Sequence, residues 1–581
     1  MLGIKSLDVQ EAVKDNGPKR TAETYLKNVL QEAVRAVAQK RKVALPDELT
    51  LELERPRFAE QGDRASSAAM QFSKLFKLPP RELAALFLAE LKKDASGFIE
   101  SLEIAGPGFI NMFLSKKWFA TVVEDVISSG PQYGALNLGK GRKVQVEFVS
   151  ANPTGPLHIG HGRGAAVGDT VANILSFTGW KVEREYYIND ADAGLQMNTL
   201  GQSVQARYFE LLGKPEEAPF PETGYKGEYI VILAQEALKM EGDRFLHLPL
   251  PESLKWFKRH AGDAILAQIR KTLEDFGVQY DVWFSEQSLY DQNLVAQAME
   301  DLKCRDYAFE SDGALWFKSS DFNDDKDRVL IRTDGAPTYF ASDIAYHRNK
   351  FVDRGFDRVI DVWGADHHGY IPRMKAGVQA LGRRPEDLDV LLIQLVNLMR
   401  GGKPVAMSTR AGVFVLLQDV LDEVGRDATR FFFLMRRSDS QLDFDLELAK
   451  TQGNDNPVYY VQYAHARISS VMRGMVERGG KLPKDARPAE RVFENEEARR
   501  LADCLASFPR EMQNASEGLA PQMLTAYAEL LAGCFHSFYN TNRILGEELE
   551  MEQGRIILAE GTRIVLRTCL DLLGVSAPER M

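Results

Sequence analysis

Cysteine is scarce in this sequence, and it has no long hydrophobic run. The 581 residues include four cysteines, and no two of them have the spacing of a metal site or a redox motif. Cys304, Cys504, Cys534 and Cys569 are therefore expected to be small buried residues in a reducing compartment. No apolar run approaches the ~18 residues that a membrane span needs, so we expect no membrane partner.

An excess of positive charge is also lacking. The formal net charge of −11 excludes a protein coated with basic surface, although a local basic face can still bind phosphates. The first twenty residues carry acidic side chains and no apolar segment typical of a secretory signal, and they do not look like a transit peptide. The sequence therefore predicts a cytoplasmic protein.

The chain is too long for one core, so we expect several domains. Residues 1–115 predict a small N-terminal α/β domain, and residues 451–581 predict a C-terminal α-helical bundle with helices at 456–475 and 521–546. Residues 116–450 predict an α/β, Rossmann-like parallel-sheet domain with an insertion at about 200–330. We expect its strands at residues 144–149, 182–188, 358–363 and 389–398.

The segment 144–168 is typical of a site for phosphate chemistry. An alternating apolar strand is followed by a turn broken by proline and glycine and then by the start of a helix, where unpaired backbone N–H groups stabilise an anion. His158 and His161 are three residues apart and can face the same side. Gly155 and Gly160 allow a ligand to approach the backbone closely.

This segment resembles a known family. His158-Ile159-Gly160-His161 behind Gly155-Pro156-Leu157 resembles the signature of class I aminoacyl-tRNA synthetases, and the run from Glu147 to Gly164 looks like its arginyl-tRNA synthetase form. Residues 456–467 and the C-terminal LLGVSAPERM look like the anticodon-binding bundle of that family, and residues 20–115 resemble its N-terminal domain, which touches the outer corner of the tRNA.

The resemblance implies a ligase that activates arginine with ATP and transfers it to the terminal ribose of tRNA(Arg). It also implies that tRNA binds before arginine is activated. The cofactors are then ATP and Mg²⁺, which is held mainly by the ATP phosphates. We expect a monomer without an obligate protein partner.

The ATP site is expected at two loops and one strand end. His158 and His161 are the expected catalytic donors, and the resemblance adds Gly155, Gly160, Gly364, Asp366, Met407 and Ser408 as ATP-binding residues. In the second signature loop, residues 401–412, Ala406 stands where class I enzymes usually have lysine. We expect Lys403 or Arg410 to supply the cation for the leaving pyrophosphate, with Arg410 favoured because its guanidinium can bridge two oxygens.

The arginine pocket needs carboxylates, because a guanidinium pairs bidentately with one. Glu147 in the strand before the ATP loop and Asp343 are the two candidates, although a solvated helix position is the alternative for Asp343. The other expected arginine-binding residues are Ser150, Asn152, His161, Tyr339 and His367. The adjacent histidines 367 and 368 do not predict a metal site, because chain neighbours rarely bind one ion.

The expected tRNA-binding residues lie in the C-terminal bundle. Residues 451–581 hold 15 Lys and Arg against 18 Asp and Glu, so charge alone does not indicate RNA binding there. Aromatic and polar side chains can stack on splayed bases, and core packing is the alternative for each tyrosine. By resemblance, the tRNA-binding residues are Tyr459, Gln462, Tyr463, Arg467 and Met581.

Two rival functions remain to be compared with this one. A catalytically weakened tRNA-binding or regulatory paralogue is suggested by Ala406, and by Gly155 at a position where family members that lack the loop lysine often have one. A small-molecule adenylyltransferase with a related His-x-Gly-His loop would leave residues 1–115 and 451–581 without a role.

Overall fold

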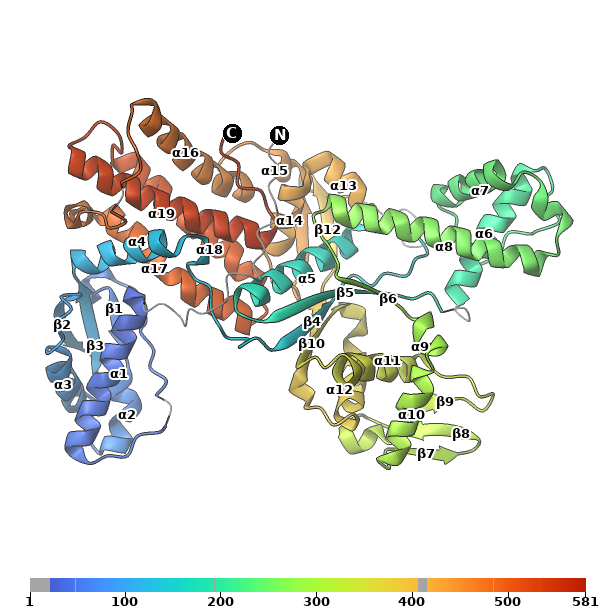
Figure 1. Cartoon of the computed structure of the whole chain (residues 1–581), viewed down its shortest axis with the longest axis horizontal. Coiled ribbons are helices and arrows are strands. Elements are labelled where there is room, and N and C mark those ends of the chain that lie inside the picture. The colour runs from blue at the N-terminus through green and yellow to red at the C-terminus, as the bar shows by residue number, and fades with distance from the viewer. Residues whose placement is uncertain (1–20, 48, 192–194, 406–414, 484) are drawn as a thin grey trace.

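The structure, a computed structural model, describes residues 21–581 except residues 48, 192–194, 406–414 and 484. Figure 1 shows an elongated molecule with a parallel sheet near its middle. The N-terminal domain and the C-terminal helices lie toward one end, and a helical insertion extends to the other. Within the described part of the chain, no helix is long and apolar enough to cross a membrane.

The N-terminal domain is a small α/β unit, as expected. Its antiparallel sheet has the order β1-β3-β2, and its first helix begins where the Thr21 side chain accepts a hydrogen bond from the Thr24 N–H. The elements are α1 (Ala22–Arg41), β1 (Arg64–Ser66), α2 (Ala68–Phe76), α3 (Pro80–Leu91), β2 (Ile99–Ala105) and β3 (Phe109–Leu114).

The central sheet is parallel and five-stranded, in the order β11-β10-β4-β5-β6. Its strands are β4 (Lys143–Glu147), β5 (Lys181–Ile188), β6 (Val282–Ser285), β10 (Arg358–Gly364) and β11 (Leu388–Ile393). The chain proceeds outward from β4 in one direction and from β10 in the other, so the topological switch point lies between β4 and β10. Ligands of such sheets bind at the carboxyl ends of the strands beside this point.

Two features of this sheet differ from the expectation. The prediction of a single strand at 389–398 is wrong, because β11 ends at Ile393 and a second strand, β12 (Val396–Arg400), follows it. β12 belongs to a different sheet, in which it pairs with β13 (Lys403–Pro404) and β14 (Leu442–Asp445). A continuous apolar run does not show where one strand ends and the next begins. The strand β6 was not expected, and it lies inside the range 200–330 that the sequence assigns to an insertion.

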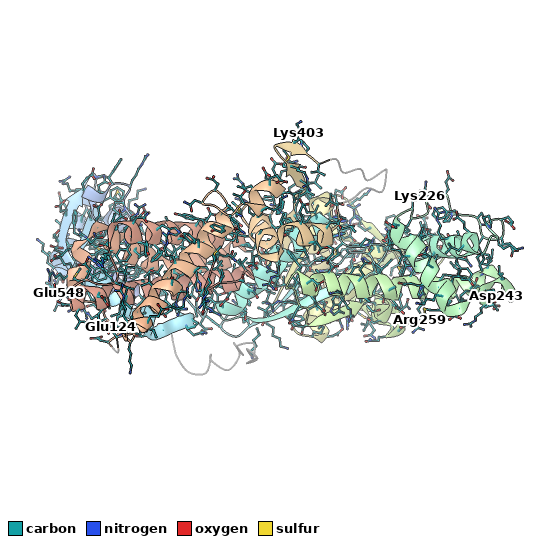
Figure 2. All side chains as sticks on the ribbon, turned by 90° about the horizontal axis from the view of Figure 1, so that it is seen from above. Glu124, Lys226, Asp243, Arg259, Lys403 and Glu548 are labelled. Carbon is teal, nitrogen blue, oxygen red and sulfur yellow. The ribbon has the colours of Figure 1, made fainter. Side chains whose placement is uncertain are left out.

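The chain leaves the sheet twice around β6. Before β6 come the helices α6 (Leu195–Leu211), α7 (Glu228–Glu241) and α8 (Leu250–Asp275), which form the far end of the molecule, with Asp243 near its tip in Figure 2. After β6 come α9 (Gln287–Asp291), α10 (Leu294–Cys304), β7 (Ala308–Ser311), β8 (Ala314–Phe317) and β9 (Arg328–Ile331). Cys304 is exposed at the end of α10, so the expectation that all four cysteines are buried is wrong.

The remaining elements surround the site and build the C-terminal bundle. Around the sheet lie α5 (Ile159–Phe177), α11 (Tyr339–Arg348), a π-helical turn (Asn349–Asp353) and α12 (Ile371–Ala380). The helices expected at 456–475 and 521–546 are present as α16 and α18. Between the sheet and the bundle lie α13 (Leu417–Val424), α14 (Arg426–Leu434) and α15 (Leu446–Lys450). The bundle, onto which α4 (Lys116–Ser129) also packs, contains α16 (Pro457–Glu477), α17 (Glu496–Glu517), α18 (Pro521–Thr541) and α19 (Leu549–Leu573).

Candidate active site

The two histidines of the first signature lie together at the start of α5. His158 is the N-cap residue, and its Nδ1 accepts a hydrogen bond from the Gly160 N–H at 3.1 Å. His161 Nδ1 accepts from the His158 N–H at 3.3 Å, and the two rings stack with centroids 3.7 Å apart. Because both Nδ1 atoms accept, each neutral ring carries its proton on Nε2. A Cβ at Gly160 would lie 3.0 Å from the His158 ring, so a side chain there would press against this ring.

Both imidazoles are neutral at neutral pH. Burial lowers the pKa of His158, and burial together with the neighbouring His158 lowers the pKa of His161 to about 3. A neutral imidazole still donates through Nε2–H, and the N-terminus of α5 adds partial positive charge at the same place. The pair therefore offers hydrogen-bond donors to an anion without carrying a full charge.

We expect the His161 ring to stay neutral down to about pH 4, because its pKa is near 3 rather than 6.5. In the unfolded chain the same imidazole binds a proton near pH 6.5, well before it does in the folded protein. His161 therefore lowers the free energy of unfolding as pH falls from 6.5 toward 3, by about 2 kcal/mol at pH 5. NMR of histidine labelled with ¹³C measures this titration, and His161→Gln identifies the signal. A His161 signal that titrates near pH 6.5 would contradict the burial effect.

Glu147 ends β4 and is already bound to a buried cation. Its Oε2 accepts from Lys350 Nζ at 2.6 Å, and its Oε1 accepts from Ser150 Oγ at 3.0 Å. Lys350 Nζ also donates to Asp361 at 3.0 Å, and His347 Nε2 lies 3.0 Å from the other Asp361 oxygen. Burial opposes the charge of Lys350, but Asp361 and Glu147 outweigh it and raise its pKa. Lys350 therefore already neutralises part of the negative charge of Glu147, which the sequence analysis expected to bind the guanidinium of arginine.

Asp343 lies near Asp361 and Lys350, and also near a carboxylate that the sequence analysis missed, Glu286. Asp343 Oδ2 accepts from the Tyr370 hydroxyl at 2.5 Å, and burial raises the pKa of Asp343. Glu286 directly follows β6 and is 5% exposed. Burial, with Asp343 and Asp190 next in effect, raises the pKa of Glu286 to about 7. Buried carboxylates that repel one another are a site for a cation, such as a guanidinium.

The other expected arginine-binding residues are less enclosed. Asn152 lies in the loop after β4, where its Oδ1 accepts from Asn189 at 2.6 Å and its Nδ2 donates to Gln196 at 2.5 Å. Tyr339 is 71% exposed at the start of α11. His367 is exposed in the turn that follows β10.

Two of the expected ATP-binding residues lie at the carboxyl end of β10. Gly364 is the last residue of this strand, and Asp366 follows it, exposed, with its Oδ2 3.6 Å from His367 Nε2. Both positions are at the edge of the sheet beside the switch point.

The second signature loop is anchored beside the first. The Ile159 N–H donates to the Val415 carbonyl at 3.2 Å, and the Leu417 N–H donates to the Leu157 carbonyl at 2.9 Å. Lys403 is exposed on the β12–β13 hairpin and stands at the edge of the molecule in Figure 2. The other residues singled out in this loop lie outside the described residues: Ala406, which stands in place of the usual lysine, and Met407, Ser408 and Arg410, which are expected to act.

The expected tRNA-binding residues lie on α16 and at the C-terminus. Tyr459, Gln462 and Met581 line one cavity of about 790 Å³. Tyr463 stacks on Tyr459 with centroids 5.9 Å apart, and Arg467 donates to the Tyr463 hydroxyl at 2.7 Å. Gln462 also donates to Asp427 and to the Ser576 carbonyl, each at 2.9 Å, so part of its role is structural.

Comparison with known families identifies the group to which this arrangement belongs. Residues 122–441 match the family described as tRNA synthetases class I (R), catalytic domain. Residues 24–114 match the arginyl tRNA synthetase N terminal domain, and residues 461–581 match the DALR anticodon binding domain. The chain belongs to the arginyl-tRNA synthetase family. The resemblance drawn from the two signature histidines is thereby confirmed.

Individual members of this synthetase family are similar to the chain over most of its length. A protein of Citrifermentans bemidjiense named arginine–tRNA ligase is 54% identical over 532 residues, which cover 91% of this chain and 95% of that protein. A putative arginyl-tRNA synthetase of Campylobacter jejuni is 37% identical with a TM-score of 0.73 and covers 81% of this chain and 100% of its own. The Thermus thermophilus arginyl-tRNA synthetase, 22% identical, shares the fold with a TM-score of 0.74 over 96% of this chain and 100% of its own.

Proposed function

We propose that the chain is an arginine–tRNA ligase that activates arginine with ATP and transfers it to tRNA(Arg). The observation that carries this proposal is that one sheet edge holds a pair of neutral imidazoles at the start of α5 and a buried group of carboxylates that suits a guanidinium. The family assignment and the relatives named arginine–tRNA ligase support the same reaction. Nothing in the described residues favours the weakened paralogue.

Activation is an attack of the arginine carboxylate on the α-phosphate of ATP, with pyrophosphate leaving. The nucleophile is already an anion, so no general base is needed and the protein acts by positioning and by stabilising charge. His158 and His161 donate Nε2–H to phosphate oxygens, and Gly155 and Gly160 let the phosphates approach the backbone. The adenosine side of the site takes Gly364 and Asp366 from the end of β10, with Met407 and Ser408 from the second loop.

Arginine is held at the other side of the switch point. Asp343 and Glu286 take the guanidinium, while Glu147, fixed by Lys350, faces it with the oxygen that Ser150 holds. The remaining residues assigned to arginine are Asn152, His161, Tyr339 and His367.

The cofactor and the partner follow from the same reaction. Mg²⁺ would enter with ATP and be held mainly by the ATP phosphates. The described residues contain no group of three or more His, Cys, Asp or Glu side chains that could hold a metal ion. Tyr459, Gln462, Tyr463, Arg467 and Met581 contact the tRNA. We also propose domain boundaries of 1–115, 116–450 and 451–581, a monomeric state and a cytoplasmic location.

The decisive experiment measures charging of bulk tRNA with radiolabelled arginine by the full chain. ATP, arginine and tRNA together should give arginyl-tRNA, and omission of ATP or tRNA should abolish the signal. Absence of charging with the complete mixture, while the chain still binds tRNA, would establish the weakened paralogue instead.

We expect the Lys403→Ala/Arg410→Ala double variant to lower the rate of arginine activation about tenfold, with an unchanged KM for arginine. The leaving pyrophosphate needs a positive partner, and Ala406 cannot supply it. Arg400→Ala is the control, because Arg400 is a cation of the same hairpin that pairs with Glu423. Parent activity in the double variant would show that neither residue replaces the lysine, and Ala406→Lys should then accelerate the enzyme.

A further inference from the structure

The loop that joins β4 to α5 has a strained backbone. Val149 and Ser150 have φ angles of 70° and 39°, in a region that residues with side chains rarely adopt. The Ser150 N–H donates to the Phe148 carbonyl at 3.0 Å, which closes a γ-turn around Val149. A β-branched residue does not hold this conformation by itself, so surrounding groups must stabilise it.

Three tyrosine hydroxyls donate to carbonyls of this loop, and they come from three different parts of the chain. Each distance is that of a good O–H···O hydrogen bond. The bonds are Tyr280 to the Phe148 carbonyl at 3.0 Å, Tyr186 to the Ala151 carbonyl at 2.8 Å, and Tyr229 to the Thr154 carbonyl at 2.8 Å.

Tyr229 differs from the other two because it belongs to the helical insertion. It lies on α7, while Tyr186 is on β5 and Tyr280 immediately precedes β6. Burial raises the pKa of Tyr229, so its hydroxyl keeps its proton and donates at any working pH. The insertion also reaches the loop from α6, where Gln196 accepts from Asn152.

Gly155 fits the same contact. A Cβ at this position would lie 3.2 Å from the Tyr229 hydroxyl oxygen, which is tighter than ordinary packing. Glycine therefore lets the hydroxyl approach the loop where the ATP phosphates are proposed to bind.

We propose that Tyr229 is a positioning residue for adenylate formation, through which the helical insertion holds the Thr154–Gly155 end of the loop, while Tyr280 and Tyr186 hold its strained end. This inference rests on the proposed placement of the ATP phosphates at that loop. Tyr229 touches neither arginine nor the reacting atoms. Its loss leaves arginine binding intact, because Tyr186 and Tyr280 still hold the other end of the loop, but it lets the Thr154–Gly155 end relax. The α-phosphate then spends less time in line with the arginine carboxylate.

The test is Tyr229→Phe, with Tyr208→Phe as the matched control. The Tyr208 hydroxyl donates to the Gly242 carbonyl at 2.5 Å, so the control removes the same kind of bond but keeps the change inside the insertion. ATP–pyrophosphate exchange is measured with saturating tRNA. We expect Tyr229→Phe to lower kcat about three- to tenfold, the scale of one hydrogen bond, with the arginine KM and the melting temperature equal to those of the control.

Four outcomes separate the possibilities. Equal kcat in Tyr229→Phe and Tyr208→Phe would overturn the inference, and so would a fall in kcat that follows an equal fall in melting temperature. Gly155→Ala should lower kcat by a smaller factor in the Tyr229→Phe background than in the parent enzyme, because the hydroxyl that the added Cβ meets is gone. If His161→Ala exchanges at the parent rate, the proposed phosphate site itself fails, and the two failures are thereby distinguished.

Discussion

Asp343→Asn should raise the KM for arginine about a hundredfold, with the KM for ATP essentially unchanged. Removing one partner of a buried charge pair commonly costs about 2–5 kcal/mol, and a hundredfold change corresponds to about 2.8 kcal/mol. The substituted amide keeps the size of the side chain and an oxygen that can accept from the Tyr370 hydroxyl, so the loss measures the charge. Steady-state charging kinetics at varied arginine and ATP give both constants.

Asp353→Asn is the control for this prediction. Asp353 is exposed and pairs with Arg348 just beyond the same helix. A normal arginine KM in Asp343→Asn would remove Asp343 from the pocket. An equal rise in both KM values would show a general loss of structure rather than a lost guanidinium contact.

Glu286 gives the same pocket a pH dependence. Its pKa of about 7 means that the empty site is partly protonated at neutral pH, and an entering guanidinium favours the charged carboxylate. The arginine KM should therefore rise as pH falls below 7 and level off above it. Glu286→Gln should raise the KM at high pH and remove this dependence.

The sequence alone predicted the residues whose roles depend on local order along the chain. The strand, the turn and the helix start that present His158 and His161 follow one another along the chain. Their spacing in the sequence is therefore enough to predict that the two side chains lie at one site. Asp343 was found because it lies on a helix in a segment that carries the family resemblance. The parallel sheet was predicted from the alternation of strand and helix patterns, and its order was not.

The residues that were missed depend on contacts between distant segments. Glu286 follows a strand of only four residues, which is too short to show a period of two. The ion pair of Glu147 with Lys350 joins positions 203 residues apart, and Lys350 lies in a π-helical turn that periodicity does not indicate. For the same reason, the tyrosine that holds Thr154 from the insertion has no signal in the sequence.

His161→Ala should lower adenylate formation by about 10²–10³, the usual scale for one lost donor at a developing charge. His161 lies in the first turn of α5, where we propose that the α-phosphate binds and gains charge in the transition state. A second explanation is structural, because His161 Nδ1 also accepts from the His158 N–H and so helps to cap the helix. Two further substitutions separate these roles.

His161→Asn keeps an acceptor near the Nδ1 position but has no donor at the Nε2 position, whereas His161→Gln places an amide N–H near Nε2. If phosphate donation matters, the Asn variant melts like the parent and stays slow, while the Gln variant recovers part of the rate. His247→Ala is the control, since His247 is exposed on the distant insertion. Parent activity in the Asn variant would reduce His161 to a helix cap and leave His158 as the sole imidazole donor to the α-phosphate.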